Sequence, residues 1–243
     1  MRSDNVRLFK TVEHACGYFS DRTAQNWVID PVAPEIANVY GSALSQGFRR
    51  AGGHVYRPTC PICHACTPTR LPVLLFQPNR RQKRCIRANA DLEISNEPAG
   101  YSDEAFALYR RYLHARHPGG GMDHNEPDDF GRFLYAPWSQ TRFLMFRDQG
   151  RLVACAVTDV TSNGLSAVYT FYDPQLSGRS LGVLAILTQI QWAQREKLPH
   201  VYLGYWIERH AKMHYKIEYR PIELLRNGQW VRFDPIMECS SEA

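Results

Sequence analysis

The pattern of hydrophobic and polar positions becomes regular after about residue 90. Residues 142–147, 151–159 and 165–172 are apolar-rich runs joined by Gln-Gly and Asn-Gly turns. They predict an antiparallel meander, because Asn-Gly is the strongest short hairpin signal. Apolar residues then recur along one broad face at helical spacing over 180–196, and a strand-like run follows at 200–206. This half of the chain therefore predicts a sheet with a long helix between two of its strands.

Other elements follow from start and stop signals. Ser102 is expected to cap a helix, since acidic residues occupy the first turn, and Pro118 with the next three glycines ends it. The remaining elements are strands at 91–95, 222–225 and 230–233, a short helix at 127–135 and a helical stretch at 209–215. The order β, α, α, β, β, β, α, β, α, β, β resembles the acetyltransferase-like GNAT fold, an α+β class with a mixed sheet flanked by helices.

The first part of the chain is rich in Pro, Gly and Cys and predicts little regular structure. A helix is expected at 39–46, ended by Gly47, and a short strand at 71–76. The composition changes near residue 88, where a basic run ends. We therefore expect two domains, a smaller basic, Cys-containing domain at 1–88 and a GNAT-like domain at 89–243.

Basic charge is concentrated in this first part. The net charge is +5, yet the first 90 residues hold 13 Lys or Arg against 5 Asp or Glu. The cluster consists of Arg49, Arg50, Arg57, Arg70 and the run Arg80, Arg81, Lys83, Arg84, Arg87. Such a cluster is typical of sites for phosphate backbones or acidic groups, and a merely solvated basic face is the alternative. No apolar run approaches the ~20 residues of a membrane span, so we expect a cytoplasmic protein without a membrane partner.

Four cysteines form a candidate metal site. Cys60, Cys63 and Cys66 have C-x-x-C-x-x-C spacing, which suits tetrahedral zinc or an iron–sulfur cluster, and Cys16 could supply the fourth ligand. His64 could compete as a ligand. The alternative is a set of reduced thiols without metal, since seven cysteines without a secretory signal do not suggest disulfides.

The segment Arg179-Ser180-Leu181-Gly182 stands where GNAT-like folds bind the phosphates of the acyl donor. Glycine lets backbone amides approach a phosphate, and a helix N-terminus favours an anion. Arg179 and Gly182 are therefore donor-binding candidates. Leu184 replaces the small residue of the usual donor loop, which argues against acetyl-CoA as the donor.

The arginines of the first part are candidates for substrate binding. Guanidinium groups bind carboxylates in a bidentate, charge-assisted manner, which suits an acidic acceptor, and they bind an RNA backbone equally well. These candidates are Arg49, Arg50, Arg57 and Arg70. Surface salt bridges are the alternative.

Tyrosines are dense on the two strands that flank the expected cleft. Tyr169, Tyr172 and Tyr205 could stack an adenine or hold an aminoacyl group, although aromatics on adjacent strands more often form core.

Many sequence blocks in one order resemble the bacterial aspartate/glutamate leucyltransferases, relatives of the arginyl-tRNA–protein transferases. The blocks are Cys16-Gly17-Tyr18, Asp30-Pro31, Gly47-Phe48-Arg49-Arg50, Tyr56-Arg57-Pro58 with the cysteines through Arg70, Arg116-His117-Pro118, Thr158-Asp159, 165–174, 179–182, 202–207, Met213-x-Tyr215-Lys216 and Arg220-Pro221. The eukaryotic arginyl branch has Cys-Gly-Tyr-Cys and a paired Cys-Cys. This chain has Phe19 and spread cysteines instead, which favours the bacterial branch and leucine.

The resemblance implies transfer of leucine from leucyl-tRNA to proteins that begin with Asp or Glu, which marks them for degradation as N-degrons. No cofactor is required for an ester-to-amide transfer, and no DNA partner is expected. Tyr215 could protonate the leaving ribose hydroxyl, Asp159 or Asp173 could orient the amine, and Lys216 could line the cleft. Either aspartate could instead cap a turn.

Three alternatives remain open: arginine as the donor amino acid, an acetyl-CoA-dependent GNAT acetyltransferase, and a non-enzymatic zinc and RNA-binding module.

Overall fold

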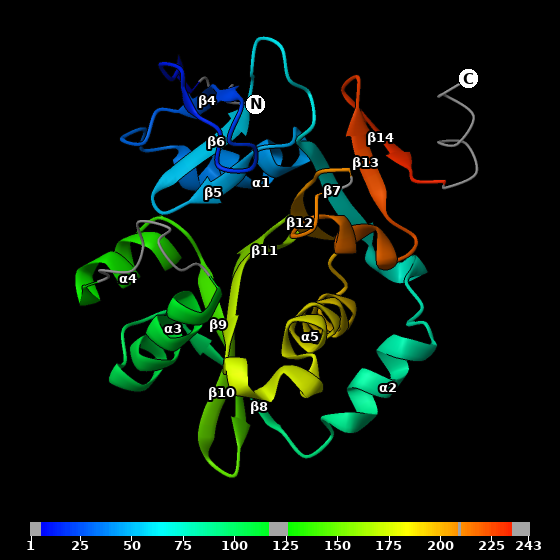
Figure 1. Cartoon of the computed structure of the whole chain (residues 1–243). Coiled ribbons are helices and arrows are strands. Elements are labelled where there is room, and N and C mark those ends of the chain that lie inside the picture. Colours follow the sequence, from blue (N-terminus) through cyan, green and yellow to red (C-terminus); the bar gives the residue numbers. More distant parts are fainter. Residues whose placement is uncertain (1–5, 117–125, 209, 235–243) are drawn as a thin grey trace.

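A computed structural model describes residues 6–116, 126–208 and 210–234 (Figure 1). Its strands are β1 (Leu8–Lys10), β2 (His14–Ala15), β3 (Thr23–Ala24), β4 (Asn26–Ile29), β5 (Arg49–Ala51), β6 (His54–Pro58), β7 (Thr67–Pro72), β8 (Glu93–Pro98), β9 (Thr141–Asp148), β10 (Arg151–Thr161), β11 (Gly164–Tyr172), β12 (His200–Trp206), β13 (Glu223–Arg226) and β14 (Gln229–Arg232). Its helices are α1 (Ile36–Ser45), α2 (Arg80–Ala88), α3 (Asp103–Arg116), α4 (Pro127–Leu134) and α5 (Leu181–Arg195), with 3-10 turns η1 (Val73–Leu75), η2 (Pro174–Arg179) and η3 (His214–Glu218). The predicted α+β class is confirmed.

The main sheet has eight strands in the order β14-β13-β7-β12-β11-β10-β9-β8. The predicted meander is present, because β9, β10 and β11 pair antiparallel as neighbours. The hairpin between β9 and β10 turns at Gln149 and Gly150, which have φ of 47° and 82°. Within this sheet β11 and β12 pair in parallel. Parallel neighbours need a crossover connection, and α5 provides it.

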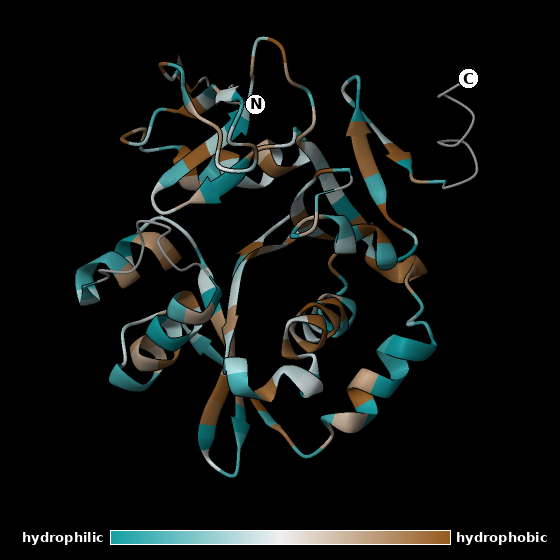
Figure 2. Ribbon diagram, viewed as in Figure 1, coloured by the Kyte–Doolittle hydropathy of each residue, from teal (hydrophilic) through white to brown (hydrophobic). Residues whose placement is uncertain are grey.

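Helices cover both faces of the main sheet (Figure 1). Side chains alternate along β9, so Phe143 and Met145 pack with α3 and α4 on one face. Leu144 and Phe146 pack with α5 on the other. Figure 2 shows the hydrophobic α5 lying beside the largely hydrophilic α2. The burial of α5 explains its nearly continuous apolar sequence, because sheet and α2 flank it.

A second sheet of four strands, in the order β1-β4-β6-β5, packs with α1. Its core includes Tyr202 of β12, so the two sheets share a hydrophobic cluster. The expected domain division at residue 88 stays a prediction. Strand β7 and helix α2 precede it and yet belong with the main sheet, where β7 lies between β12 and β13 and α2 contacts α5.

Most predicted elements of the second part are confirmed within a few residues, including the cap at Ser102, whose hydroxyl accepts from the Ala105 amide. In the first part α1 begins three residues earlier than predicted. The strand predicted at 71–76 is wrong: the strand is 67–72, held by β12 and β13 on its two sides, and a 3-10 turn follows. The stretch predicted at 209–215 is the turn η3 at 214–218, with residue 209 outside the described part, and Pro118 and the glycines after it also lie outside.

Candidate functional site

The two parallel strands β11 and β12 diverge soon after they meet. They pair at Leu165 with Val201 and at Ser166 with Tyr202, and no further pairing between them follows in the described residues. Beyond these positions each strand keeps its outer neighbour, β10 or β7. Along the facing edges of the two strands, backbone N–H and C=O groups therefore lack a partner strand. Another part of the chain must supply their hydrogen bonds. We call this place the splay.

Arg49 of β5 occupies the start of the splay. Its guanidinium donates to the carbonyl of Ala167 on β11, to the carbonyl of Tyr202 on β12 and to the hydroxyl of Ser166. The residue is only 8% exposed. All three acceptors are uncharged, and no carboxylate of the described residues lies within 4.0 Å of it. Arg49 is thus a largely desolvated cation without a counter-ion, which suits it to bind an incoming anion.

A bulge in β12 makes room for this guanidinium. The register shifts between Tyr202 and Gly204, and Gly204 has φ of +83°. A Cβ added to Gly204 would lie 3.1 Å from Nε, 3.2 Å from Cζ and 3.3 Å from Nη2 of Arg49. These nearly equal distances mean that the flat face of the guanidinium rests on the glycine. An added Cβ would therefore require the guanidinium to shift by a few tenths of an ångström, and the positive φ of Gly204 would be strained as well.

Lys216 is a second buried cation in this region, 4% exposed. Its Nζ donates to the carbonyl of Tyr205 and contacts Sδ of Met213. Burial and, to a smaller extent, the positive charge of Arg49 together lower the pKa of Lys216 to about 7. Tyr205 itself donates to the carbonyl of Gly47, which connects β12 to the turn before β5. Tyr205 is therefore a buried structural contact rather than an open binding surface.

Aromatic residues gather where β11 ends. The hydroxyl of Tyr172 accepts from Arg116 at 2.6 Å, and its ring lies 5.0 Å from the Tyr112 ring. Tyr169 packs into the core beneath α3, where burial raises its pKa. Tyr215, on η3, is 42% exposed; partial burial raises its pKa, and the nearby Tyr172 side chain adds a smaller rise. Tyr172 and Tyr215 are thus the tyrosines that combine mutual proximity with exposure.

Comparisons with known proteins identify the family. The family described as "Arginine-tRNA-protein transferase, C terminus" matches residues 104–226, and its "N terminus" counterpart matches 14–84. The aspartate/glutamate leucyltransferase of Stenotrophomonas maltophilia (strain R551-3) is 52% identical over 96% of this chain and 95% of its own. The chain belongs to the arginine-tRNA-protein transferase family. The aspartate/glutamate leucyltransferase of Xylella fastidiosa (strain 9a5c) is 49% identical over 95% of this chain and 93% of its own.

Among solved structures, the C-terminal domain of a putative lysylphosphatidylglycerol synthetase from Agrobacterium fabrum superposes with a TM-score of 0.47 at 12% identity. It covers 70% of this chain and 51% of that one. A likeness at this level carries no argument about activity. None of the helices in the described part of the chain combines the length and the apolar composition of a membrane span.

In this member of the transferase family, Arg50 and Asp159 form a completely buried ion pair. Nε and Nη2 of Arg50 donate to the two carboxylate oxygens of Asp159 at 2.7 and 2.9 Å. Tyr40 and Thr141 also donate to this carboxylate, and both partners have 0% side-chain exposure. This geometry favours a structural role for both residues, which joins β5 to β10. The sequence predicts that Arg50 binds the acceptor and that Asp159 acts in catalysis, but neither side chain is exposed where a substrate could contact it.

Arg179 and Asp173 are also engaged within the protein. Arg179 pairs with Asp91 and Asp148 and donates to the side chain of Asn89, so its charge is already neutralised. Asp173 is buried, pairs with Arg151 and caps η2 by accepting from the Gln175 amide. The alternative that this aspartate caps a turn is confirmed.

Gly182 remains open to its predicted role. It lies in the first turn of α5, beside Tyr172, and a Cβ there would be 3.4 Å from the tyrosine ring. The end of β11, with Tyr172, and the N-terminus of α5 therefore meet.

Arg57 and Arg70 lie nearer the surface. Arg57 donates to the carbonyl of Gln46 and stacks on Phe48. Arg70 pairs with Glu223 across β7 and β13 and stacks on Trp230. The neutralised Arg70 is thus less suited to bind an anion than Arg49, while Arg57 keeps an unneutralised charge among the described residues.

The four cysteines of the candidate metal site lie near one another. Burial and, to a smaller extent, the other three thiols together raise the pKa of Cys66 to about 12. The Ala65 amide and the Arg22 guanidinium instead lower the pKa of Cys63. In the part of the chain that the structure describes, no three His, Cys, Asp or Glu side chains are placed to hold a metal ion. The zinc or iron–sulfur site stays a prediction.

Sequence reasoning missed three contributors to the splay, although all lie in the quoted sequence blocks. Ser166 binds Arg49, Gly204 supports it, and Arg116 holds Tyr172. A glycine inside a strand pattern signals a bulge or a close approach, so Gly204 could have been found. Ser166 and Arg116 carry no such signal, because their roles depend on contacts with distant segments.

Proposed function

We propose that this chain transfers leucine from leucyl-tRNA to the N-terminal Asp or Glu of proteins and so creates an N-degron in the cytoplasm. The observation that carries the proposal is the identity of about half of all residues, over nearly the whole chain, with proteins named aspartate/glutamate leucyltransferase. The site supports it by offering a buried, unpaired cation where an acidic acceptor needs one.

The fold in this proposal is GNAT-like, with a Cys-containing N-terminal domain before it. Three features support it: β11 and β12 are parallel and diverge, α5 connects them after the short turn η2, and an antiparallel meander precedes them. The family matches at 14–84 and 104–226 leave residue 88 between them, which supports a division there. In that division β7 belongs to the first domain by sequence but forms part of the sheet of the second domain.

Arg49 and Lys216 together recognise the acidic acceptor. Two buried cations close to one another repel, and the charge of Arg49 adds to the burial that lowers the pKa of Lys216. A carboxylate that enters the splay relieves the repulsion and forms charge-assisted hydrogen bonds. A neutral N-terminal side chain cannot relieve the repulsion, and a basic one adds to it. The acceptor preference for Asp and Glu follows from this difference.

The reaction is aminolysis of an ester. The lone pair of the acceptor's α-amino nitrogen attacks the leucyl carbonyl carbon, a C–N bond forms, and the C–O bond to the terminal ribose of the tRNA breaks. One proton leaves the nitrogen, and one reaches the ribose oxygen. An α-amino group has a pKa of about 8, so a useful fraction is neutral at pH 7 and strong base catalysis is unnecessary. Positioning the two groups supplies much of the acceleration.

Tyr215 donates the proton to the leaving ribose oxygen in this scheme. Its exposure allows contact with a substrate, and a phenol, whose ordinary pKa is about 10, carries its proton at neutral pH. Tyr172, held by Arg116, faces the same end of the splay as Gly182 and lines the donor side. A Tyr215→Phe variant should transfer more slowly at unchanged acceptor KM. An undiminished rate would remove this role.

The decisive experiment is a transfer assay with purified protein, separately charged leucyl- and arginyl-tRNA, and peptides that begin with Asp, Glu, Lys or Ala. We expect leucine on the Asp and Glu peptides alone. Transfer of arginine would be consistent with the mechanism but would contradict leucyl-tRNA as the donor. No transfer from either tRNA would overturn the proposal, and calorimetry with acetyl-CoA would then test the acetyltransferase alternative.

A further inference from the structure

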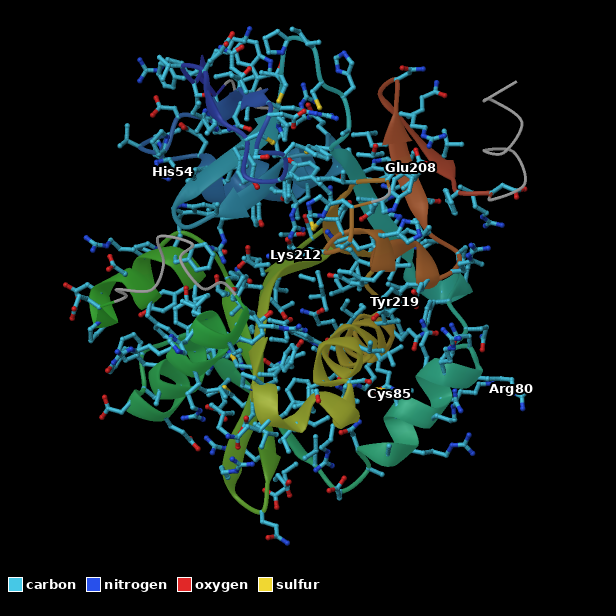
Figure 3. All side chains as sticks on the ribbon, in the orientation of Figure 1. His54, Arg80, Cys85, Glu208, Lys212 and Tyr219 are labelled. Carbon is cyan, nitrogen blue, oxygen red and sulfur yellow. The ribbon has the colours of Figure 1, made fainter. Side chains whose placement is uncertain are left out.

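Helix α2 carries a stripe of basic side chains that the proposed reaction does not use. Arg80, Lys83, Arg84 and Arg87 are all exposed and have the spacing i, i+3, i+4, i+7 of one helix face. We call these four residues the α2 stripe. The opposite face is turned inward and consists of Gln82, Cys85, Ile86 and Asn89. Figure 3 shows Arg80 directed away from the protein and Cys85 on the side of α5.

The inward face fixes α2 at both ends. Asn79 and Gln82 form a capping box at the first turn, and Gln82 also donates to the carbonyl of Glu218. At the other end Asn89 donates to the carbonyl of Arg179 at 2.9 Å. The helix is therefore a rigid support that presents its charges in a fixed array.

The charges of the stripe are not neutralised by the protein. No carboxylate of the described residues lies within 4.0 Å of any of the four, whereas Arg147 and Arg179 each have an acidic partner. Without such partners, four cations within two turns repel one another at low ionic strength. An array of this kind, mostly arginine, matches a polyanion that can form planar hydrogen bonds with guanidinium groups.

The stripe leads toward the expected donor end of the site. Cys85, on the inward side of α2, contacts the carbonyl of Ser180, the residue immediately before α5. Gly182, in the first turn of α5, lies against the ring of Tyr172 at the end of β11. From Arg80 to Arg87 the helix rises about 10 Å, roughly three phosphate steps of a nucleic-acid strand.

We propose that the α2 stripe binds the phosphate backbone of the donor tRNA while its aminoacylated end enters the splay beside α5. This rests on the proposed function for the identity of the nucleic acid. The contact is to phosphates and therefore independent of base sequence, so it would strengthen binding of any tRNA and leave the choice of amino acid to other parts of the site.

The test compares three proteins by fluorescence anisotropy with labelled, uncharged tRNA at several salt concentrations. One is the unaltered chain, and one carries Arg80→Gln, Lys83→Gln, Arg84→Gln and Arg87→Gln. The control carries Lys10→Gln and Arg195→Gln, which removes two exposed charges, one on β1 and one at the far end of α5. Far-ultraviolet circular dichroism and a thermal melt check that each protein is folded.

We expect the stripe variant to bind tRNA at least tenfold more weakly at about 100 mM salt, and the control to change little. Each lost phosphate contact should also flatten the slope of log K against log salt by about 0.7–0.9. A variant with lysine at all four positions should keep most of the salt slope, because the charges remain. Equal affinity and slope in the stripe variant and the unaltered chain would overturn the inference.

Binding is measured without the transfer reaction, so the two proposals fail separately. A chain that binds tRNA through α2 and transfers no leucine keeps this inference and loses the proposed function. If the chain transfers leucine and the stripe variant binds tRNA normally, the proposed function is kept and this inference is lost. Loss of binding to anionic vesicles or acidic peptides, with tRNA binding unchanged, would assign the stripe to another partner and overturn the inference.

Discussion

Replacing Asp159 by asparagine separates a structural role of this residue from a catalytic one. The carboxylate accepts two hydrogen bonds from Arg50 and one each from Tyr40 and Thr141, and it is fully buried. Asparagine has nearly the same shape and removes the negative charge. The guanidinium of Arg50 is then left in the interior without a counter-ion, and the new amide group brings donors toward groups that are already donors.

The expected loss of stability is large. Breaking a buried ion pair by removing one partner costs about 3–5 kcal/mol. A domain of ordinary stability unfolds with about 5–15 kcal/mol, so the variant loses a substantial share of its free energy of unfolding. The half-buried pair Arg70–Glu223, with side-chain exposures of 16% and 19%, provides the matched control. Glu223→Gln should cost about 1 kcal/mol or less.

The assay is urea-induced unfolding of the unaltered chain, Asp159→Asn and Glu223→Gln, followed by circular dichroism. Leucine transfer is measured on the same samples at low temperature, where the folded fraction is highest. A double variant, Arg50→Met with Asp159→Leu, removes both charges and should recover much of the lost stability. Refolded activity of this double variant would show that neither group takes part in chemistry.

One result would refute the structural reasoning. If Asp159→Asn unfolds with the free energy of the unaltered chain and yet transfers leucine at least tenfold more slowly, Asp159 acts on the reaction rather than on the fold. A loss of stability in Glu223→Gln as large as that in Asp159→Asn would also contradict the argument, because burial would then not decide the cost.

Three further predictions concern the splay. Arg49→Gln should raise the KM for Asp and Glu peptides at least tenfold and weaken their advantage over Ala peptides, while Arg49→Lys should retain part of it; peptide kinetics would measure both, and an unchanged preference would rule out this recognition. Lys216 has a folded pKa of about 7 against a usual 10.5, so the unfolded chain binds the proton more readily and stability should rise from pH 7 toward pH 10. Relative to Lys216→Met, the gain between pH 7 and 9 should be on the order of 2 kcal/mol in urea unfolding, and parallel curves would contradict the burial of this amine. Gly204→Ala should combine left-handed strain of about 1–2 kcal/mol with displacement of Arg49 and so reduce acceptor affinity, whereas Gly150→Ala, with φ of +82° and open space, should cost stability alone.

Regular elements of the second part could be read from the sequence, because local rules define them. The turns at Gln149–Gly150 and Asn227–Gly228 have the positive φ values that such pairs favour, and Ser102 caps its helix. The long apolar α5 and the strand at 200–206 also followed from periodicity. In the first part, short strands and the basic helix α2 were missed, because their polar sequences carry little periodicity and are stabilised by tertiary pairing.

The amino-acid sequence by itself determined the family resemblance, the acidic-acceptor chemistry expected of it and the importance of the arginines. It could not decide which arginine is free to act. In the tertiary structure Arg50, Arg70 and Arg179 are neutralised by carboxylates from distant segments, whereas Arg49 meets only uncharged oxygens. That distinction depends on long-range contacts: a guanidinium is available to a substrate where folding has brought no carboxylate against it.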